Sequence, residues 1–201
     1  MTQVGGAGPD QVDDRERRYH GALLGVVVGD ALGAPFEGHP GLVPPAFLTR
    51  IDAGQALLRY TDDTTMTFAL AESLLFCRRL DLDHLAATFA TACQREPHRG
   101  YGPAVAQLLG RVATGAGWAQ AAASQFGGQG SFGNGAAMRV PPIGICAHGS
   151  LEVAAELGRE SARVTHTHPE GVDAAGARLQ PWLSLWPTPP PAPTTLRPPT
   201  G

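Results

Sequence analysis

Residues 60–65 read Tyr60-Thr61-Asp62-Asp63-Thr64-Thr65 and are followed at once by apolar residues with helical spacing. Residues three and four apart share one face of a helix, so this stretch predicts a helix that begins at the acidic pair. Its buried face would consist of Met66, Ala69, Leu70, Ser73, Leu74 and Cys77. The stretch therefore predicts a helical core with a cluster of oxygen-bearing side chains at one helix start.

The acidic pair admits two interpretations. Asp62 and Asp63 are adjacent carboxylates that would repel each other in a dry site, and Mg²⁺ or Ca²⁺, which take oxygen ligands, would neutralise them. Alternatively, Thr61 and the two Asp residues cap the helix and favour the positive end of its dipole. These residues alone leave both interpretations open.

Helical spacing recurs on both sides of this stretch. Residues 15–32 combine helically spaced apolar residues with Gly21, Gly25 and Gly29, which predicts a buried helix with a smooth face for close packing. A Pro- and Gly-rich loop is expected to follow, up to about residue 59. Further helices are predicted from residue 81 to 96, from 103, and over 118–124, 150–164 and 169–177. No segment shows convincing strand alternation, so we predict an all-α fold.

Composition favours one folded domain. The chain has 201 residues, of which 43% are hydrophobic and 16% charged, so it can bury a core. A net charge of −3 provides no basic field for nucleic acid. The apolar run 22–28 is too short and too acidic in its flanks for a signal peptide, and no membrane span is expected. Cys77, Cys93 and Cys146 lack metal-binding spacing and fall among apolar residues, which favours buried free thiols and a cytoplasmic location.

The two ends differ from the middle. Residues 1–12 are small and polar and predict a disordered leader, which leaves 13–177 as the helical domain. Proline crowds into residues 178–201 and favours an extended or disordered tail. Such a tail suits SH3- or WW-type partners, although a truncated or frameshifted reading frame accounts better for the abrupt change.

A glycine-rich loop is the second informative stretch. It runs from Phe126 through Gly127-Gly128-Gln129-Gly130-Ser131-Phe132-Gly133-Asn134 to Gly135. A loop of this kind before a helix exposes backbone N–H groups that can bind phosphate. It lacks both the Walker and the Rossmann signatures, and it can equally be a simple connector.

Two further positions are candidates. Glu37 follows the first helix and is either an active-site carboxylate or an exposed loop acid. His166 and His168 precede Pro169, but two imidazoles without a third ligand are weak evidence for zinc. We therefore expect a ligand-contacting or structural histidine.

Taken together, these stretches resemble the ADP-ribosylglycohydrolase family, in particular its ADP-ribosylhydrolases that act on serine-linked ADP-ribose, poly-ADP-ribose and related O-linked species. The matching stretches are 21–25, 29–33, 36–37, 60–64, 99–102, 130–140 and 165–166. They occur in order across residues 18–177, which makes the set more specific than any one piece.

The resemblance implies an orthogonal multi-helix bundle around two Mg²⁺ ions. It implies that Thr61, Asp62 and Asp63 supply half of the metal ligands, and that Glu37 lies beside the scissile ribose bond and is catalytic together with the two Asp residues. The implied substrate-binding residues are Phe126, Gly130, Ser131, Phe132, Gly133 and His166. The loop would hold the diphosphate, and the phenylalanines would pack on adenine or ribose.

The activity implied is Mg²⁺-dependent hydrolysis of the bond that links ADP-ribose to protein side chains or within poly-ADP-ribose. The family's remaining metal ligands lie in a C-terminal Gly-Asp-Thr-Asp-Thr-like segment, whereas no Asp or Glu follows Asp173 here. We therefore expect a bundle that is incomplete at its C-terminus and has reduced activity. The alternatives are a non-catalytic module that binds ADP-ribose or ADP-ribosylated protein, and a helical scaffold.

Overall fold

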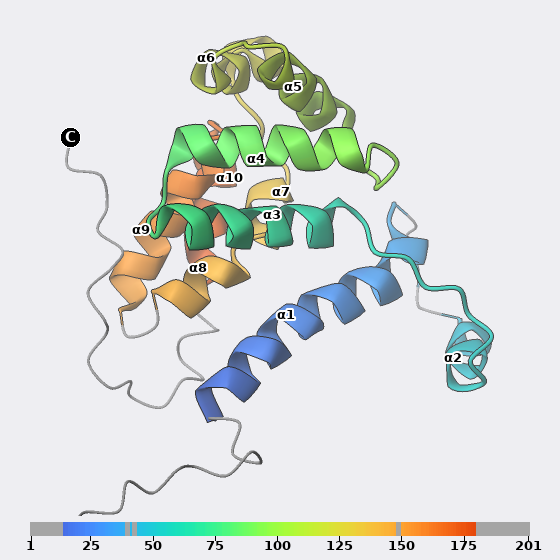
Figure 1. Cartoon of the computed structure of the whole chain (residues 1–201). Helices are drawn as coiled ribbons and strands as arrows, with labels where there is room; N and C mark the ends of the chain where they lie inside the picture. Colours follow the sequence, from blue (N-terminus) through green and yellow to red (C-terminus); the bar gives the residue numbers. More distant parts are fainter. Residues whose placement is uncertain (1–13, 39–40, 42–43, 148–149, 180–201) are drawn as a thin grey trace, which may run out of the picture.

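The computed structural model describes residues 14–38, 41, 44–147 and 150–179. Within them the chain is helical and contains no strand (Figure 1), so the predicted all-α class is confirmed. The predicted leader 1–12 and residues 180–201 of the predicted tail lie outside the described residues. The helices are α1 (Asp14–Gly33), η1 (Ala34–Phe36), α2 (Pro45–Asp52), α3 (Asp62–Cys77), α4 (Leu82–Arg95), α5 (Pro103–Ala113), α6 (Trp118–Ala123), η2 (Gln125–Gly128), α7 (Gly135–Met138), α8 (Pro141–Cys146), α9 (Leu151–Ala162) and α10 (Pro169–Ala177).

Local sequence explains where most helices begin. Thr61, Asp81 and Ser150 are N-caps whose side chains accept a backbone N–H from the first turn of α3, α4 and α9. Pro103 and Pro169 open α5 and α10, where the N–H that proline lacks would have no helical partner anyway. These starts agree with those predicted from sequence.

Helix α2 lies within the segment predicted to be a loop. It begins at Pro45, directly after Pro44. Proline disfavours a helix interior but suits the first helical position. The prolines that suggested a loop thus mark a helix start, and the edge-to-face contact between Phe36 and Phe47, with ring centroids 4.8 Å apart, joins α2 to η1.

The core lies around α3 and α4, which run side by side, with α5 and α6 beyond α4 (Figure 1). Helix α1 lies on the opposite side of α3 and runs obliquely to it. The predicted face of α3 is buried at Met66, Ala69, Leu70, Ser73 and Leu74. Helices α7, α8 and α9 pack on this pair, and α10 packs on α9. Leu179, just after α10, is also buried in this core.

The predicted burial of the first helix holds only in part, since Ala31 is buried and Leu23, Val26 and Val27 are partly buried. Helix α1 forms as expected, but Leu24 and Val28 are 62% and 53% exposed. A Cβ added at Gly21, Gly25 or Gly29 would meet no described atom within 4 Å. Periodicity predicts that a helix has an apolar face, but it does not say whether a neighbour covers that face.

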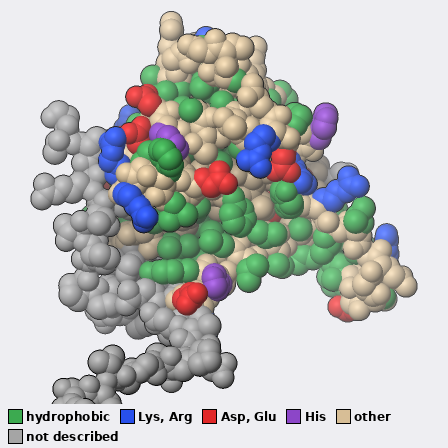
Figure 2. Space-filling model, in the orientation of Figure 1, with side chains coloured by type: hydrophobic (Ala, Val, Ile, Leu, Met, Phe, Trp, Pro, Cys, Tyr) green, Lys and Arg blue, Asp and Glu red, His purple; other side chains and the backbone are tan. Residues whose placement is uncertain are grey.

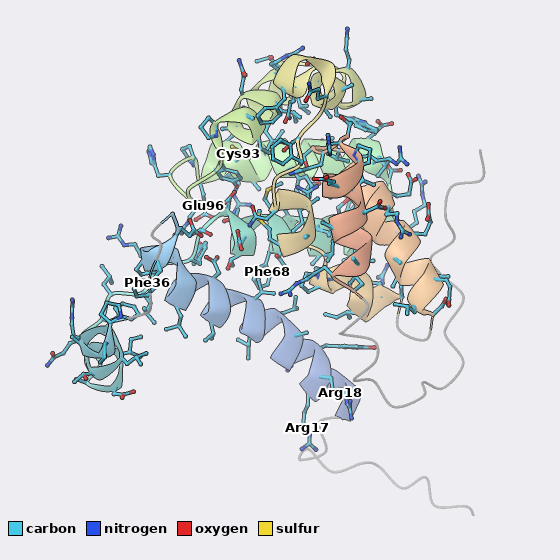
Figure 3. The ribbon with its side chains drawn as sticks, turned by 180° about the vertical axis from the view of Figure 1, so that it is seen from behind. Arg17, Arg18, Phe36, Phe68, Cys93 and Glu96 are labelled. Carbon is cyan, nitrogen blue, oxygen red and sulfur yellow. The ribbon has the colours of Figure 1, made fainter. Side chains whose placement is uncertain are left out.

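An apolar surface extends from α1 across α3. Hydrophobic side chains gather over these two helices in Figure 2. Phe68, Leu75 and Phe76 of α3 are exposed, and Figure 3 shows Phe68 on the side of α3 that faces α1. Phe68 and Val27 line a shallow pocket of about 360 Å³ there. The described residues therefore leave one face of the bundle uncovered.

Candidate functional site

Asp30 of α1 joins this helix to the start of α3. Its carboxylate accepts hydrogen bonds from the N–H and hydroxyl of Thr61 at 2.8 and 2.7 Å, and from the N–H and hydroxyl of Thr64 at 3.1 and 2.5 Å. Thr61 in turn accepts the N–H of Asp63, so the capping interpretation is confirmed for Thr61. Four donors thus converge on one carboxylate, which ties the acidic turn to α1.

Asp62 and Asp63 are both half-buried in the first turn of α3. Burial, followed by the charges of neighbouring carboxylates that include Glu37 and Asp30, raises the pKa of each to about 6. A nearby cation would relieve this repulsion, and carboxylate and hydroxyl oxygens suit a hard ion such as Mg²⁺. Among the described residues, no group of three or more His, Cys, Asp or Glu side chains lies close enough to hold a metal ion.

The acidic pair faces a pocket of about 480 Å³. Predicted site residues that line it are Glu37, Asp62, Asp63, Phe126, Ser131, Gly133 and His166. Residues that are far apart in sequence thus meet at one cavity of the size that small ligands occupy. A second pocket, of about 670 Å³, shares Glu37, Asp63, Asn134 and Met138 with the first, so Glu37 and Asp63 lie between the two pockets.

Further contacts lie beside the side of the pocket that carries Asp62 and Asp63, which we call the acidic wall. The Arg99 guanidinium lies 3.5 Å from the centre of the Tyr60 ring and donates two hydrogen bonds to Glu96, at 2.9 and 2.6 Å. The Tyr60 hydroxyl donates to the same carboxylate at 3.0 Å. Glu96 directly follows α4 (Figure 3), so these contacts tie the end of α4 to the residue before Thr61.

Three predicted site residues lie outside the lining of the 480 Å³ pocket. Thr61 is engaged by Asp30. Phe132 is exposed, and its ring centroid lies 6.1 Å from that of Phe126. Gly130 is buried with a φ of +77°, and its N–H already donates to the Gln125 carbonyl at 3.0 Å.

Gly130 is therefore a packing residue. A Cβ at this position would overlap the Thr167 hydroxyl and lie 2.6 Å from the His168 nitrogen. The Gly130 N–H donates to the Gln125 carbonyl in this structure, and a role of Gly130 in ligand binding stays a prediction.

Other glycines allow His166 to approach the loop. A Cβ at Gly135 would lie 3.0 Å from Cε1 of His166, and a Cβ at Gly171 would lie 2.7 Å from the Ser131 carbonyl oxygen. The Gly133 N–H donates to the Ser131 hydroxyl at 3.3 Å. Close packing against His166 and α10 thus explains much of the glycine pattern.

Sequence reasoning assigned no role to Arg139, Gln125 or Asp30. Arg139 is fully buried. Its position between the apolar residues Met138 and Val140 was a signal in the sequence that could have indicated this burial. Both amide atoms of Gln125 are buried without a hydrogen-bond partner among the described residues, and Gln125 lines the pocket. A buried amide of this kind normally takes its partners from water or a ligand.

Fold and site together define an all-α protein in which half-buried carboxylates and a glycine-rich loop share one pocket. Residues 11–179 match the ADP-ribosylglycohydrolase family, and the chain belongs to that family. It is 37% identical to ADP-ribosylhydrolase ARH3 of Xenopus tropicalis over 166 residues, which cover 79% of this chain and 47% of that protein. Human ARH3 is 33% identical over 171 residues, with coverage of 79% and 47%.

A solved structure supports the same fold. A chain described as an ADP-ribosylglycohydrolase-related protein complex superposes with a TM-score of 0.62 at 30% identity, covering 83% of this chain and 55% of that chain. These comparisons confirm the family resemblance. The chain spans about half the length of the curated relatives it matches.

Neutralising Asp63 tests the electrostatics of the acidic turn. A carboxyl whose pKa is about 6 when folded and near 4 when unfolded binds more protons in the native state, so the stability of the metal-free protein falls as pH rises through this window. In EDTA at about pH 7.5, Asp63→Asn should raise stability by about 1 kcal/mol, after allowing for solvent that reaches the group, or about 3 °C in Tm.

At about pH 4 the wild-type side chain is mostly protonated when folded, so thermal melts of the two proteins should nearly coincide. A variant that is no more stable than wild type at the higher pH would show that burial and repulsion do not disfavour the charge of Asp63.

Proposed function

We propose that this chain forms the ADP-ribose-binding and acidic part of an ADP-ribosylhydrolase site. In this proposal the site uses Mg²⁺ to cleave the bond that links ADP-ribose to protein side chains or within poly-ADP-ribose. The observation that carries the proposal is the single pocket lined by Glu37, Asp62, Asp63, the glycine-rich loop and His166. Relatives named ADP-ribosylhydrolase support the substrate class.

The glycine-rich loop forms the side of the pocket that would bind ADP-ribose, which we call the binding wall. The Ser131 hydroxyl accepts the Gly133 N–H, so its own proton is directed to another acceptor, such as an oxygen of the diphosphate. Phe126 is 55% exposed and has a φ of 49°, an uncommon conformation for a residue other than glycine. Such conformations persist where the surroundings enforce them and often mark ligand sites, and the exposed ring offers a face for adenine.

The acidic wall supplies the chemistry. Asp62, Asp63 and the Thr61 hydroxyl oxygen would hold Mg²⁺, of which the family resemblance implies two ions. When bound, the metal supplies a Lewis acid that orients ribose hydroxyls and activates water. In this proposal Glu37 accepts a proton from the attacking water, and the carboxylates stabilise the positive charge that develops on the ribose.

A second candidate function is ADP-ribose binding without hydrolysis. Phe126, Ser131, Gly133 and His166 all line the pocket within the described residues, whereas the carboxylates there form no metal-binding group of three. Calorimetric titration with ADP-ribose, with and without EDTA, separates the two functions when combined with an assay of ADP-ribose release. Binding that persists in EDTA without any release would favour the second.

The cellular location forms part of the proposal. No described helix is both long and apolar enough to cross a membrane. The cysteines Cys77, Cys93 and Cys146 are free, but Cys77 and Cys93 are only partly buried and Cys146 is exposed, so the expected full burial is wrong. Unpaired thiols suit a reducing compartment, and we propose the cytoplasm.

Glu37→Gln tests the catalytic role. The amide keeps the shape of the side chain but cannot take a proton, so release of ADP-ribose from an ADP-ribosylserine peptide at saturating Mg²⁺ should fall by about a hundredfold or more. ADP-ribose affinity should change little. Glu72→Gln, which neutralises a carboxylate at the separate pocket beside α1, is the matched control. Normal release by the Glu37 variant would rule out this assignment.

Phe126→Ala tests the adenine contact. Loss of base stacking should weaken ADP-ribose about tenfold, since stacking of a base on an aromatic ring contributes about 1–3 kcal/mol. Ribose 5-phosphate, which has no base, should bind equally to both proteins in the same titration. Phe76→Ala, at an exposed ring near the far end of α3, controls for loss of a surface aromatic. An equal loss for both ligands would point to distortion of the loop instead.

A further inference from the structure

Three side chains form a continuous hydrogen-bonded row behind the pocket. Nη2 of Arg139 donates to the Thr165 hydroxyl oxygen at 2.8 Å, and this oxygen lies 2.7 Å from Nδ1 of His166. Arg139 and Thr165 are completely buried, and His166 is 4% exposed. The row runs from the end of α7 to the turn before α10.

The direction of the protons in this row follows from donor chemistry. A guanidinium can only donate, so the Thr165 oxygen accepts from Arg139. The hydroxyl proton of a buried threonine needs an acceptor of its own, and Nδ1 of His166 is its other hydrogen-bond partner among the described residues. If Nδ1 donated instead, the Thr165 proton would be buried without a partner.

His166 is therefore a neutral imidazole that carries its proton on Nε2. Burial, followed by the positive charge of Arg139, lowers the pKa of His166 to about 3. Nε2 faces the glycine-rich loop, since a Cβ at Gly135 or Gly133 would lie 3.3 or 3.8 Å from it. No described residue forms a hydrogen bond with Nε2, and His166 lines the pocket.

A purely structural role explains Arg139 poorly. Its guanidinium lies 4.5 Å from the centre of the Phe89 ring and donates to the Ser161 carbonyl at 3.2 Å, but its Nε has no partner among the described residues. Burial lowers the pKa of Arg139 to about 9, which shows that the surroundings disfavour its charge. Replacing buried charges by hydrophobic residues is often neutral or stabilising. Stability of the fold alone therefore does not explain why a buried arginine stands at this position.

We propose that Arg139 and Thr165 are positioning residues that fix His166 as an Nε2–H donor toward the ligand on the glycine-rich loop. The group it recognises is an acceptor oxygen, from a phosphate or a ribose hydroxyl of a nucleoside diphosphate sugar. The identity of this ligand rests on the proposed function, whereas the position of the proton does not. Because Nδ1 accepts from Thr165 and Nε2 carries the proton, the imidazole of His166 presents one N–H donor to the glycine-rich loop in a fixed orientation.

Nitrogen NMR tests the position of the proton without any ligand. Protein labelled with ¹⁵N-histidine should show the long-range correlation pattern of a neutral imidazole protonated at Nε2, assigned to His166 by its absence from His166→Asn. In Thr165→Val, which has nearly the same shape but no hydroxyl, the pattern should shift toward the other tautomer or a mixture. Thr165→Ser should restore the wild-type pattern.

The same variants are then titrated with ADP-ribose. Thr165→Val should bind about tenfold more weakly, as expected for one misdirected hydrogen bond to a charged or strongly polar group, while Thr165→Ser stays close to wild type. Thr167→Val is the matched control, since it removes a hydroxyl from the same turn but outside the row.

Protonation of His166 at Nδ1 in the wild-type protein would overturn the proposal. An unchanged NMR pattern and an unchanged affinity in Thr165→Val would overturn it as well. If the NMR patterns are as expected but the wild-type protein does not bind ADP-ribose, the positioning role stands and the proposed function fails.

Discussion

The Asp30 carboxylate accepts four hydrogen bonds from Thr61 and Thr64, and the conformation of the acidic turn depends on this contact. Helix α1 otherwise runs obliquely on the outside of α3, and the described residues leave Leu24 and Val28 exposed. Hydrogen bonds to an ionised acceptor each contribute roughly 1.5–3 kcal/mol when they are well formed. This one side chain therefore holds α1 against the first turn of α3, which carries Asp62 and Asp63.

Arg139 links the acidic wall to the binding wall electrostatically. Its buried charge lowers the pKa of Asp62, against the larger effect of burial, and also lowers the pKa of His166. The same cation thus favours the ionised carboxylate on one side and the neutral imidazole on the other. A pocket arranged in this way offers negative charge where a metal would bind and an uncharged N–H donor near the loop.

Sequence predicted what depends on neighbours along the chain. The start of α3 at the acidic pair, the caps of α4 and α9, and the start of α10 at Pro169 all follow from local rules and are confirmed. Sequence could not predict what depends on distant neighbours. No described atom packs against Gly25 or Gly29 of α1, and Gly130 packs against Thr167 while its N–H donates to the Gln125 carbonyl. Asp30 marked only the end of an apolar run, because its partners lie more than thirty residues away.

The most direct test is ADP-ribose binding by Asp30→Asn in the presence of Mg²⁺. The amide turns one acceptor into a donor that faces the Thr61 and Thr64 donors, so the acidic turn should lose its fixed conformation. We predict at least about tenfold weaker binding, since more than one charge-assisted hydrogen bond is lost, while Asp52→Asn, at an exposed site in α2, binds as wild type does. Wild-type affinity in Asp30→Asn would contradict the account, because the site would then form without the contact on which it is said to depend.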